Sequence, residues 1–347
     1  MDMVEPGLAE AAGVARALLM APIDAIERVR GAGGNSRIYR IRNGADWFAI
    51  KHYPPRHEDS RNRLKTEMEA LAFMERHGIA VVPRPLASDA ERGYALLSWV
   101  EGDPIDDSAD ETDIGAAADF LANLHRLRGV AEAQGQPAGA EACLSGVEVV
   151  AQLGRRLTRL GEVAEADPAL AQLVDEIAAW LFGNVLPAVG QGYQPLGLSF
   201  ALPLPIRWRS LCPSDFGFHN AMRSAAGLTF LDFEYFGWDD PVKLTCDFLL
   251  HPGMRLSEPL KRRFVAAALQ IYGADPTFAP RLRLMYPLFA IRWCLILLNE
   301  FLPERWAYRV HADGGSDWEN AKERQLGRAS DLLASVKSNG GGFPHDD

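Results

Sequence analysis

The sequence predicts an α+β protein with two lobes, a small β-rich N-terminal lobe and a large helical C-terminal lobe. The chain has 347 residues, more than one ordinary domain of about 150 residues. Two extended runs, 36–42 and 47–53, flank the pair Asn43–Gly44, which is the strongest short-range signal of a β-hairpin. Beyond residue 103, apolar residues recur mainly at helical spacing. The β-rich part is therefore expected first and the helical part second.

The N-terminal lobe is predicted to hold a small sheet and one helix. Apolar residues follow helical spacing over about residues 60–77, and Gly78 ends this helix. Two short apolar runs, 81–86 and 94–100, predict two further strands beside the hairpin.

The C-terminal lobe is predicted to be a set of amphipathic helices. Asp167 before Pro168 and Asp240 before Pro241 predict two helix starts, since Asp caps a helix and Pro suits its first position. A loop at 129–145, a Gly/Pro-rich stretch at 189–205 and a hairpin-like region at 206–236 interrupt the helices. The expected helices span about 112–127, 147–165, 168–187, 241–250, 257–272, 278–302 and 317–337.

Composition narrows the class of protein. Thirty-six basic and 46 acidic residues give a net charge of −10, which argues against a nucleic-acid partner because such proteins usually carry a basic face. Four dispersed cysteines without a CxxC pair fit a reducing compartment. The most apolar run, Tyr286 to Leu302, contains Arg292 and Glu300 and is too short and polar for a membrane span. We therefore expect a soluble cytoplasmic protein without a membrane span.

The densest set of chemically active side chains lies between residues 212 and 247. Asn220 and Asp232 flank a sequence that turns near Ala226, so a hairpin there would bring the two side by side. Asp215 comes five residues earlier, in an aromatic and glycine-rich loop. Carboxylate and amide oxygens suit Mg²⁺, and a separate aspartate suits the positioning of a hydroxyl group. A lone loop aspartate is usually a turn former, but this combined spacing is the arrangement of kinase catalytic loops.

A lysine in the N-terminal lobe supplies a second candidate site. Lys51 is one of only six lysines and lies inside the extended run 47–53, where a charged side chain needs a partner or ligand. Glu67 on the following helix is within reach, although an edge-strand lysine beside a surface glutamate is an equal alternative for the pair alone. The glycine-rich segment 31–35 favours the nucleotide interpretation, because its backbone N–H groups can cover phosphates.

At this point the chain resembles the aminoglycoside phosphotransferase and choline kinase superfamily, the small-molecule branch of the protein-kinase-like fold. The likeness covers roughly residues 25–305. It is carried in order by the segments GAGGNSRIYRI, WFAIKHY, TEMEALAFMERHGIAVVPRPL, LLSWVEGDPI, DFLANLHRL, SDFGFHN, FLDFEYFGWDDP and CDFLLHP.

The resemblance implies an ATP-dependent phosphotransferase that uses Mg²⁺ and acts on a hydroxyl group of a small molecule. It implies an ion pair between Lys51 and Glu67, a catalytic Asp215, and Mg²⁺ held by Asn220 and Asp232. It also implies nucleotide contacts along the glycine-rich turn and the hinge, at Gly33, Gly34, Asn35, Ser36, Leu97 and Trp99. The implied parts are a nucleotide-binding lobe at 1–100, a helical lobe with the catalytic loop and acceptor site at 101–337, and a disordered tail at 338–347.

One departure from the family pattern keeps other functions open. The family's catalytic loop usually reads His-Gly-Asp-x4-Asn, but Pro213 and Ser214 stand here before the aspartate. A catalytically weak nucleotide-binding pseudokinase is therefore an alternative to an enzyme. A protein kinase is a weaker one, because no activation segment of the expected length separates Asp232 from Asp240.

The acceptor is the least determined part. A sugar, an amino sugar or an amino alcohol is expected, and an aminoglycoside-modifying kinase is the alternative. A monomer or weak homodimer is expected for the assembly.

Overall fold

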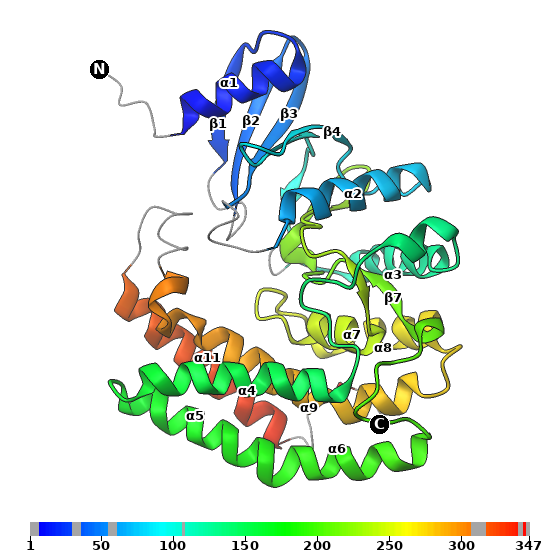
Figure 1. Cartoon of the computed structure of the whole chain (residues 1–347), viewed down its shortest axis with the longest axis vertical. Helices are drawn as coiled ribbons and strands as arrows, with labels where there is room; N and C mark the ends of the chain where they lie inside the picture. Colours follow the sequence, from blue (N-terminus) through cyan, green and yellow to red (C-terminus); the bar gives the residue numbers. More distant parts are fainter. Residues whose placement is uncertain are drawn as a thin grey trace. The chain divides into compact units, whose positions relative to one another are not determined.

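The computed structural model describes residues 7–29, 36–54, 61–105, 108–306, 317–338 and 343–344. The described residues form two compact units (Figure 1). The first unit takes its residues from Met1–Ile105 and Asn220–Phe236, and the second from Asp106–His219, Gly237–Ala307 and Ser316–Asp347. The predicted lobe boundary at 100–101 and the predicted tail stay predictions.

A five-stranded antiparallel sheet forms the centre of the first unit. The strand order is β1-β2-β3-β5-β4, and the predicted hairpin is its middle, with Gly44 in the left-handed region at φ 60°. The strand expected at 81–86 begins later, because a turn follows Gly78 and pairing with β5 starts only at Pro85. The strands are β1 (Ala25–Val29), β2 (Arg37–Asn43), β3 (Asp46–His52), β4 (Pro85–Asp89) and β5 (Tyr94–Ser98).

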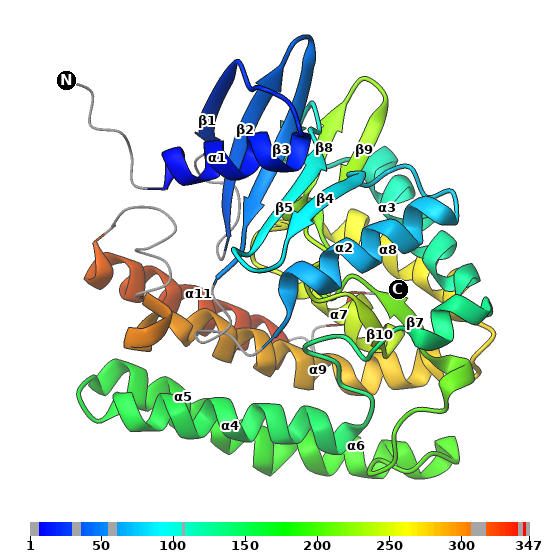
Figure 2. The same cartoon turned by 45° about the horizontal axis from the view of Figure 1, so that its top comes forward.

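Two helices pack with this sheet. Helix α1 (Leu8–Leu19), absent from the sequence prediction, lies beside the sheet (Figure 2). It buries Ala11, Val14 and Ala15 against apolar side chains of β2, β3 and β5. Helix α2 (Arg63–Arg76) is the expected one, and its first turn is capped by the Asn62 side chain. Together they cover apolar surface of a small sheet that needs such cover to be stable.

The second expected hairpin is also present and belongs to the first unit. Strand β8 (Ala221–Ser224) pairs with β9 (Gly227–Phe230), and β6 (Asp103–Pro104) pairs with β8. Gly102 makes this pairing possible, since a Cβ atom there would lie 2.6 Å from the Arg223 carbonyl oxygen. The turn near Ala226 therefore forms as predicted.

The second unit is largely helical. Its helices are α3 (Glu111–Leu127), α4 (Gly146–Ala164), α5 (Pro168–Trp180), α6 (Leu186–Tyr193), α7 (Pro241–Leu250), α8 (Glu258–Tyr272), α9 (Phe278–Leu297) and α11 (Trp318–Ser338). Strand β7 (Ser210–Cys212) pairs with β10 (Gly237–Asp239). The predicted starts are confirmed: Asp167 accepts a hydrogen bond from the Leu170 N–H and Asp240 one from the Val242 N–H.

One helical path differs from the sequence prediction. The helix expected over 168–187 breaks into a π-helical turn at Leu181–Val185 and resumes as α6, which reaches into the stretch expected to be a Gly/Pro-rich connection. The wider turn accommodates Pro187, which lacks an N–H. Gly192 serves close packing here, since a Cβ atom on it would lie 2.3 Å from the Leu284 side chain.

Two helical stretches are long and apolar enough to cross a membrane by length and composition. One is Phe278–Phe301, of which 72% of the apolar window is buried inside the protein, as in the core helix of a globular unit. The other is Pro168–Leu196, with 33% of its window buried. Such segments are weak evidence for a span, and the absence of one stays a prediction.

A buried histidine in the second unit predicts acid sensitivity. The Nδ1 atom of His125 lies 3.2 Å from the Ser210 hydroxyl, and burial together with the charge of Arg128 lowers its pKa to about 4. Below about pH 6.5 the His125 imidazole is protonated in the unfolded chain but stays neutral in the folded chain. The free energy of unfolding therefore falls by up to ~1.4 kcal/mol for each unit by which the pH is lowered. We expect His125→Asn, whose amide can replace Nδ1, to show a shallower loss between pH 6.5 and 4 in urea titrations. An unchanged slope would contradict this.

Candidate active site

A lysine and three carboxylates form the polar centre of the first unit. Lys51 is 6% exposed, and its Nζ atom lies 2.6 Å from Glu67 Oε2 and 2.6 Å from Asp232 Oδ1. Glu234 Oε2 lies 3.6 Å from the same nitrogen. The predicted ion pair between Lys51 and Glu67 is therefore present, and Asp232 joins it.

Strand β3 and helix α2 fix this ion pair from both sides. Lys51 lies in a central strand, opposite Ile38 of β2 and Ala95 of β5, so the edge-strand alternative is wrong. Glu67 is 2% exposed and accepts two hydrogen bonds, one from the Tyr53 hydroxyl at 2.5 Å and one from the Phe233 N–H at 3.2 Å. Both carboxylate oxygens of Glu67 are thus used, and the glutamate is held in place for the lysine.

Electrostatics keep Lys51 positively charged. Burial lowers its pKa, but the charges of Asp232 and Glu67 raise it by more, and the net pKa lies well above the usual value. The lysine is therefore an ammonium group with three donors at neutral pH. Such a group can contact phosphate oxygens.

Glu234 is the member of this cluster to which the sequence assigns no defined role. Arg63 pairs with its Oε1 atom, and the Ser36 hydroxyl lies 3.5 Å from Oε2. Burial and the neighbouring charge of Asp232 raise the pKa of Glu234 to about 7. Its position two residues after Asp232 was the sequence signal that could have identified it.

The residues around Asp232 fit a divalent cation. Carboxylate oxygens of Glu67, Asp232 and Glu234 lie within 4.8 Å of one another. The hairpin also brings Asn220 to this segment, because the Leu231 N–H donates to the Asn220 carbonyl at 2.8 Å. Oxygen donors of this kind are those that Mg²⁺ prefers. Asp232 has a φ of 66°, an uncommon backbone state that clusters at functional sites.

The remaining nucleotide candidates are placed in part. Leu97 is buried in β5, opposite Ala49. Trp99 follows that strand and packs on the Arg40 guanidinium at 4.7 Å, and its buried indole N–H has no partner among the described residues. Ser36 is buried beside Glu234. Gly33, Gly34 and Asn35 lie outside the described residues.

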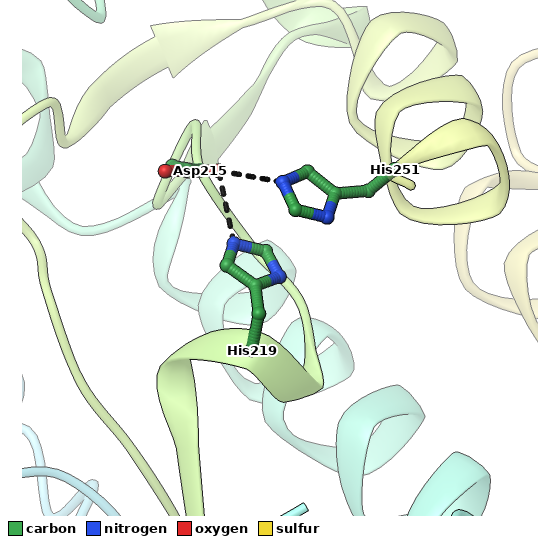
Figure 3. A group of neighbouring side chains, drawn as sticks. All are labelled: Asp215, His219 and His251. Atoms are coloured by element: carbon green, nitrogen blue, oxygen red, sulfur yellow. Dashed lines mark hydrogen bonds and ion pairs between the residues drawn. The ribbon is translucent and has the colours of Figure 1, made fainter. Parts of the chain in front are cut away.

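A second cluster lies in the second unit, around Asp215 (Figure 3). The loop after β7 is anchored by Phe216, which stacks on Phe120 and Phe248, and by Phe218, which meets Phe248 edge-on at 5.4 Å. With these rings in the core, the Asp215 side chain stays 41% exposed. The loop thus holds its aspartate within reach of solvent on a rigid aromatic base.

Two histidines accompany Asp215. His219 Nε2 lies 3.1 Å from Asp215 Oδ1, and His251 Nε2 lies 4.0 Å from it. Partial desolvation raises the pKa of Asp215, but the hydrogen bond and charge of His219 lower it by more, to well below its usual range. Asp215 is therefore ionised at neutral pH and can accept a hydrogen bond from a hydroxyl group. Neither histidine was expected at this position from the sequence.

The departure at Ser214 has a backbone consequence. Ser214 has a φ of 71°, the left-handed state that a side chain disfavours and glycine tolerates. We expect Ser214→Gly to be more stable than Ser214→Ala by about 1 kcal/mol, because both lack the hydroxyl and only glycine avoids the Cβ clash. Chemical denaturation of the two variants measures this, and equal stabilities would refute it.

Comparisons with known proteins agree with this geometry. The family model described as "APH: Phosphotransferase enzyme family" matches residues 26–284. No curated protein sequence matches the chain.

Solved structures share the fold at low identity. Choline kinase LicA from Streptococcus pneumoniae is 15% identical, with a TM-score of 0.59 and coverage of 94% of this chain and 99% of that chain. A choline/ethanolamine kinase family protein from Mesorhizobium loti is 19% identical, with a TM-score of 0.59 and coverage of 95% and 99%. Spectinomycin phosphotransferase APH(9)-Ia, in complex with ADP and spectinomycin, is 11% identical, with a TM-score of 0.55 and coverage of 90% and 94%. These likenesses establish the protein-kinase-like fold expected from the sequence.

Proposed function

Because the chain belongs to the APH phosphotransferase enzyme family, we propose that it transfers the γ-phosphoryl group of ATP to a hydroxyl group of a small molecule. The observation that carries this proposal is the buried cluster of Lys51 with Glu67 and Asp232. Kinases bind the phosphates of the donor nucleotide with a strand lysine that a helix glutamate holds in place, and an aspartate beside it binds the metal. Lys51, Glu67 and Asp232 correspond to these three residues. The ADP complex of the spectinomycin enzyme supports the choice of nucleotide.

The first unit is assigned to the phosphoryl donor. In the proposal Lys51 contacts the α- and β-phosphates, and Glu67 keeps its side chain extended. Asn220 and Asp232 would hold Mg²⁺, which when bound offsets negative charge on the phosphates. The indole of Trp99 and the backbone near Leu97 would face the adenine.

The Asp215 loop of the second unit is assigned to the acceptor. The acceptor oxygen bonds to the γ-phosphorus while the bond from that phosphorus to the β–γ bridging oxygen breaks, and ADP leaves. The proton of the acceptor hydroxyl passes to the Asp215 carboxylate, or it passes to water while Asp215 only orients the hydroxyl. Because the pKa of Asp215 is low, its main contribution is to orient the hydroxyl rather than to remove its proton early.

The acceptor is proposed only as a class: a sugar, an amino sugar or an amino alcohol. The proteins with this fold are named for different small molecules, namely choline, ethanolamine and spectinomycin. Their sequences are only 11–19% identical to this chain. An aminoglycoside acceptor therefore stays an alternative. A cytoplasmic location, where ATP is available, and a monomeric or weakly dimeric state are part of the same proposal.

A screen of ADP release tests the function directly. The full chain is incubated with ATP and Mg²⁺ and with single members of a panel of sugars, amino sugars, amino alcohols and aminoglycosides. We expect acceptor-dependent ADP release that stops when EDTA removes Mg²⁺. Mg²⁺-dependent thermal stabilisation by ATP without release for any acceptor would support a nucleotide-binding pseudokinase instead. Neither stabilisation nor release would overturn the proposal.

A further inference from the structure

Two stacked imidazole rings approach a single oxygen of Asp215. The rings of His219 and His251 are nearly parallel, with 6° between their planes and 3.7 Å between their centroids. Each directs Nε2 toward Oδ1 of Asp215, at 3.1 and 4.0 Å. Figure 3 shows the second carboxylate oxygen pointing away from both rings. Both rings therefore engage the same oxygen, Oδ1.

The hydrogen bonds around the rings determine where the protons lie. The Gly253 N–H donates to His251 Nδ1 at 3.1 Å, so that atom carries no proton. A neutral His251 then carries its proton on Nε2, facing Asp215. Burial and the neighbouring His219 lower the pKa of His251 to about 4, which keeps it neutral at pH 7. An ionised carboxylate only accepts, so His219 Nε2 is also a donor.

The His251 ring is itself held by the core of the second unit. His251 caps the end of α7 and meets the Trp293 ring edge-on at 4.7 Å. The Trp293 indole N–H donates to Asp247 Oδ1 at 2.9 Å, which fixes that ring in turn. His251 is therefore packed against the core, and His219 stacks on it.

We propose that His219 and His251 are positioning residues that hold Oδ1 of Asp215 and so fix the direction in which the carboxylate meets the acceptor hydroxyl. The inference rests on the proposed phosphotransferase function. The two histidines follow Asp215 in the sequence and support its loop. Pro213 and Ser214, which precede it, provide no imidazole. A carboxylate held by two imidazole rings keeps one orientation, and misplacement of a reacting group by about 1 Å can lower rates about 10²-fold.

The same three residues do not favour a transition-metal site. Their ligand atoms lie within 4.8 Å of one another, so geometry alone allows a metal. A metal bound at His251 Nε2 requires the ring proton on Nδ1, where it would meet the Gly253 N–H. Zn²⁺ binding is therefore treated as an opposing outcome of the test.

Matched substitutions separate positioning from a structural role. Glutamine can place an amide N–H near the Nε2 position, whereas alanine cannot. With an accepted substrate, we expect His219→Ala to lower kcat by about 10–10²-fold, with the KM for ATP changed less than about two-fold. We expect His219→Gln to recover most of that kcat. His251→Ala and His251→Gln should follow the same order with smaller effects, and His77→Gln, at the residue that follows α2, serves as the control.

A double-mutant cycle tests whether the histidines act through the Asp215 carboxylate. In the Asp215→Asn background, His219→Ala should cause almost no further loss of kcat, because the carboxylate that it holds is gone. An equal loss in both backgrounds, no loss in the parent, or no recovery by glutamine would overturn the inference. Stoichiometric Zn²⁺ binding by the wild type that His251→Ala abolishes would overturn it as well.

One readout does not depend on turnover. In ¹⁵N-labelled protein, His251 should show the tautomer with its proton on Nε2, and Asp215→Asn should shift the Nε2 signal of His219. If no acceptor is found but both signals behave so, the proposed function fails and the carboxylate support stands. If His251 carries its proton on Nδ1, the inference fails whatever the enzyme does.

Discussion

Asp215→Asn is expected to lower turnover by at least roughly 10²-fold and to change ATP affinity only a few-fold. The amide keeps the size of the side chain but loses the negative charge that accepts the hydroxyl hydrogen bond. ATP affinity should be spared because the proposal assigns the nucleotide to Lys51, Asn220 and Asp232 in the first unit. Steady-state kinetics on an identified acceptor and calorimetric titration with ATP and Mg²⁺ measure the two quantities.

A matched aspartate controls for the loss of one charge. Asp175 lies exposed on α5 of the same unit, and Asp175→Asn should leave turnover and affinity unchanged. Full activity in Asp215→Asn would remove this aspartate from the mechanism and leave the kinase likeness as one of fold alone. A large loss of ATP affinity would instead place it among the nucleotide contacts.

Lys51→Met is expected to abolish the thermal stabilisation of the protein by ATP and Mg²⁺ and to lower turnover by roughly 10²-fold or more. Its ammonium group lies 2.6 Å from a carboxylate oxygen of Glu67 and 2.6 Å from one of Asp232. The variant should also unfold more easily without nucleotide, by about 3–5 kcal/mol, since buried carboxylates lose their partner. The tested quantity is therefore the shift on adding nucleotide, not the melting temperature itself.

Two further variants keep this test informative. Lys51→Arg retains the charge and should fold, but its planar group cannot reproduce the lysine's contacts, so turnover should still fall. Lys65→Met removes a lysine of α2 that is 64% exposed, and it should behave as the wild type. Equal ATP-induced shifts in Lys51→Met and the wild type would refute the assignment of Lys51 to the donor site.

Local signals predicted most elements that this protein forms. The Asn43–Gly44 pair predicted the β2–β3 hairpin, and the turn near Ala226 predicted β8–β9. Such turns depend on a few neighbouring residues, so they can be predicted from the local sequence. The same holds for the helix starts at Asp167 and Asp240, where a side chain caps N–H groups two or three residues away.

Other elements depended on partners distant in the chain. Helix α1 is stabilised by apolar contacts with β2, β3 and β5, and no strong local signal marked it. The start of β4 at Pro85 is set by its pairing with β5. Helix α6 contains two glycines, and one of them, Gly192, lets the helix pack closely on Leu284 of α9.

The candidate active site also has features that the sequence predicts and features that depend on the tertiary structure. The sequence by itself determined the kinds of residue and their order, Lys51 and Glu67, then Asp215, Asn220 and Asp232, because spacing along the chain records them. Only the tertiary structure decided which charges meet: Asp232 and Glu234 around Lys51, Arg63 on Glu234, and His219 and His251 on one oxygen of Asp215. Hydrogen bonds and ion pairs act over about 3–4 Å, whereas Lys51 and Asp232 are 181 residues apart in the chain. A contact of that kind exists only once the packing of sheet, helix and hairpin has brought its atoms together.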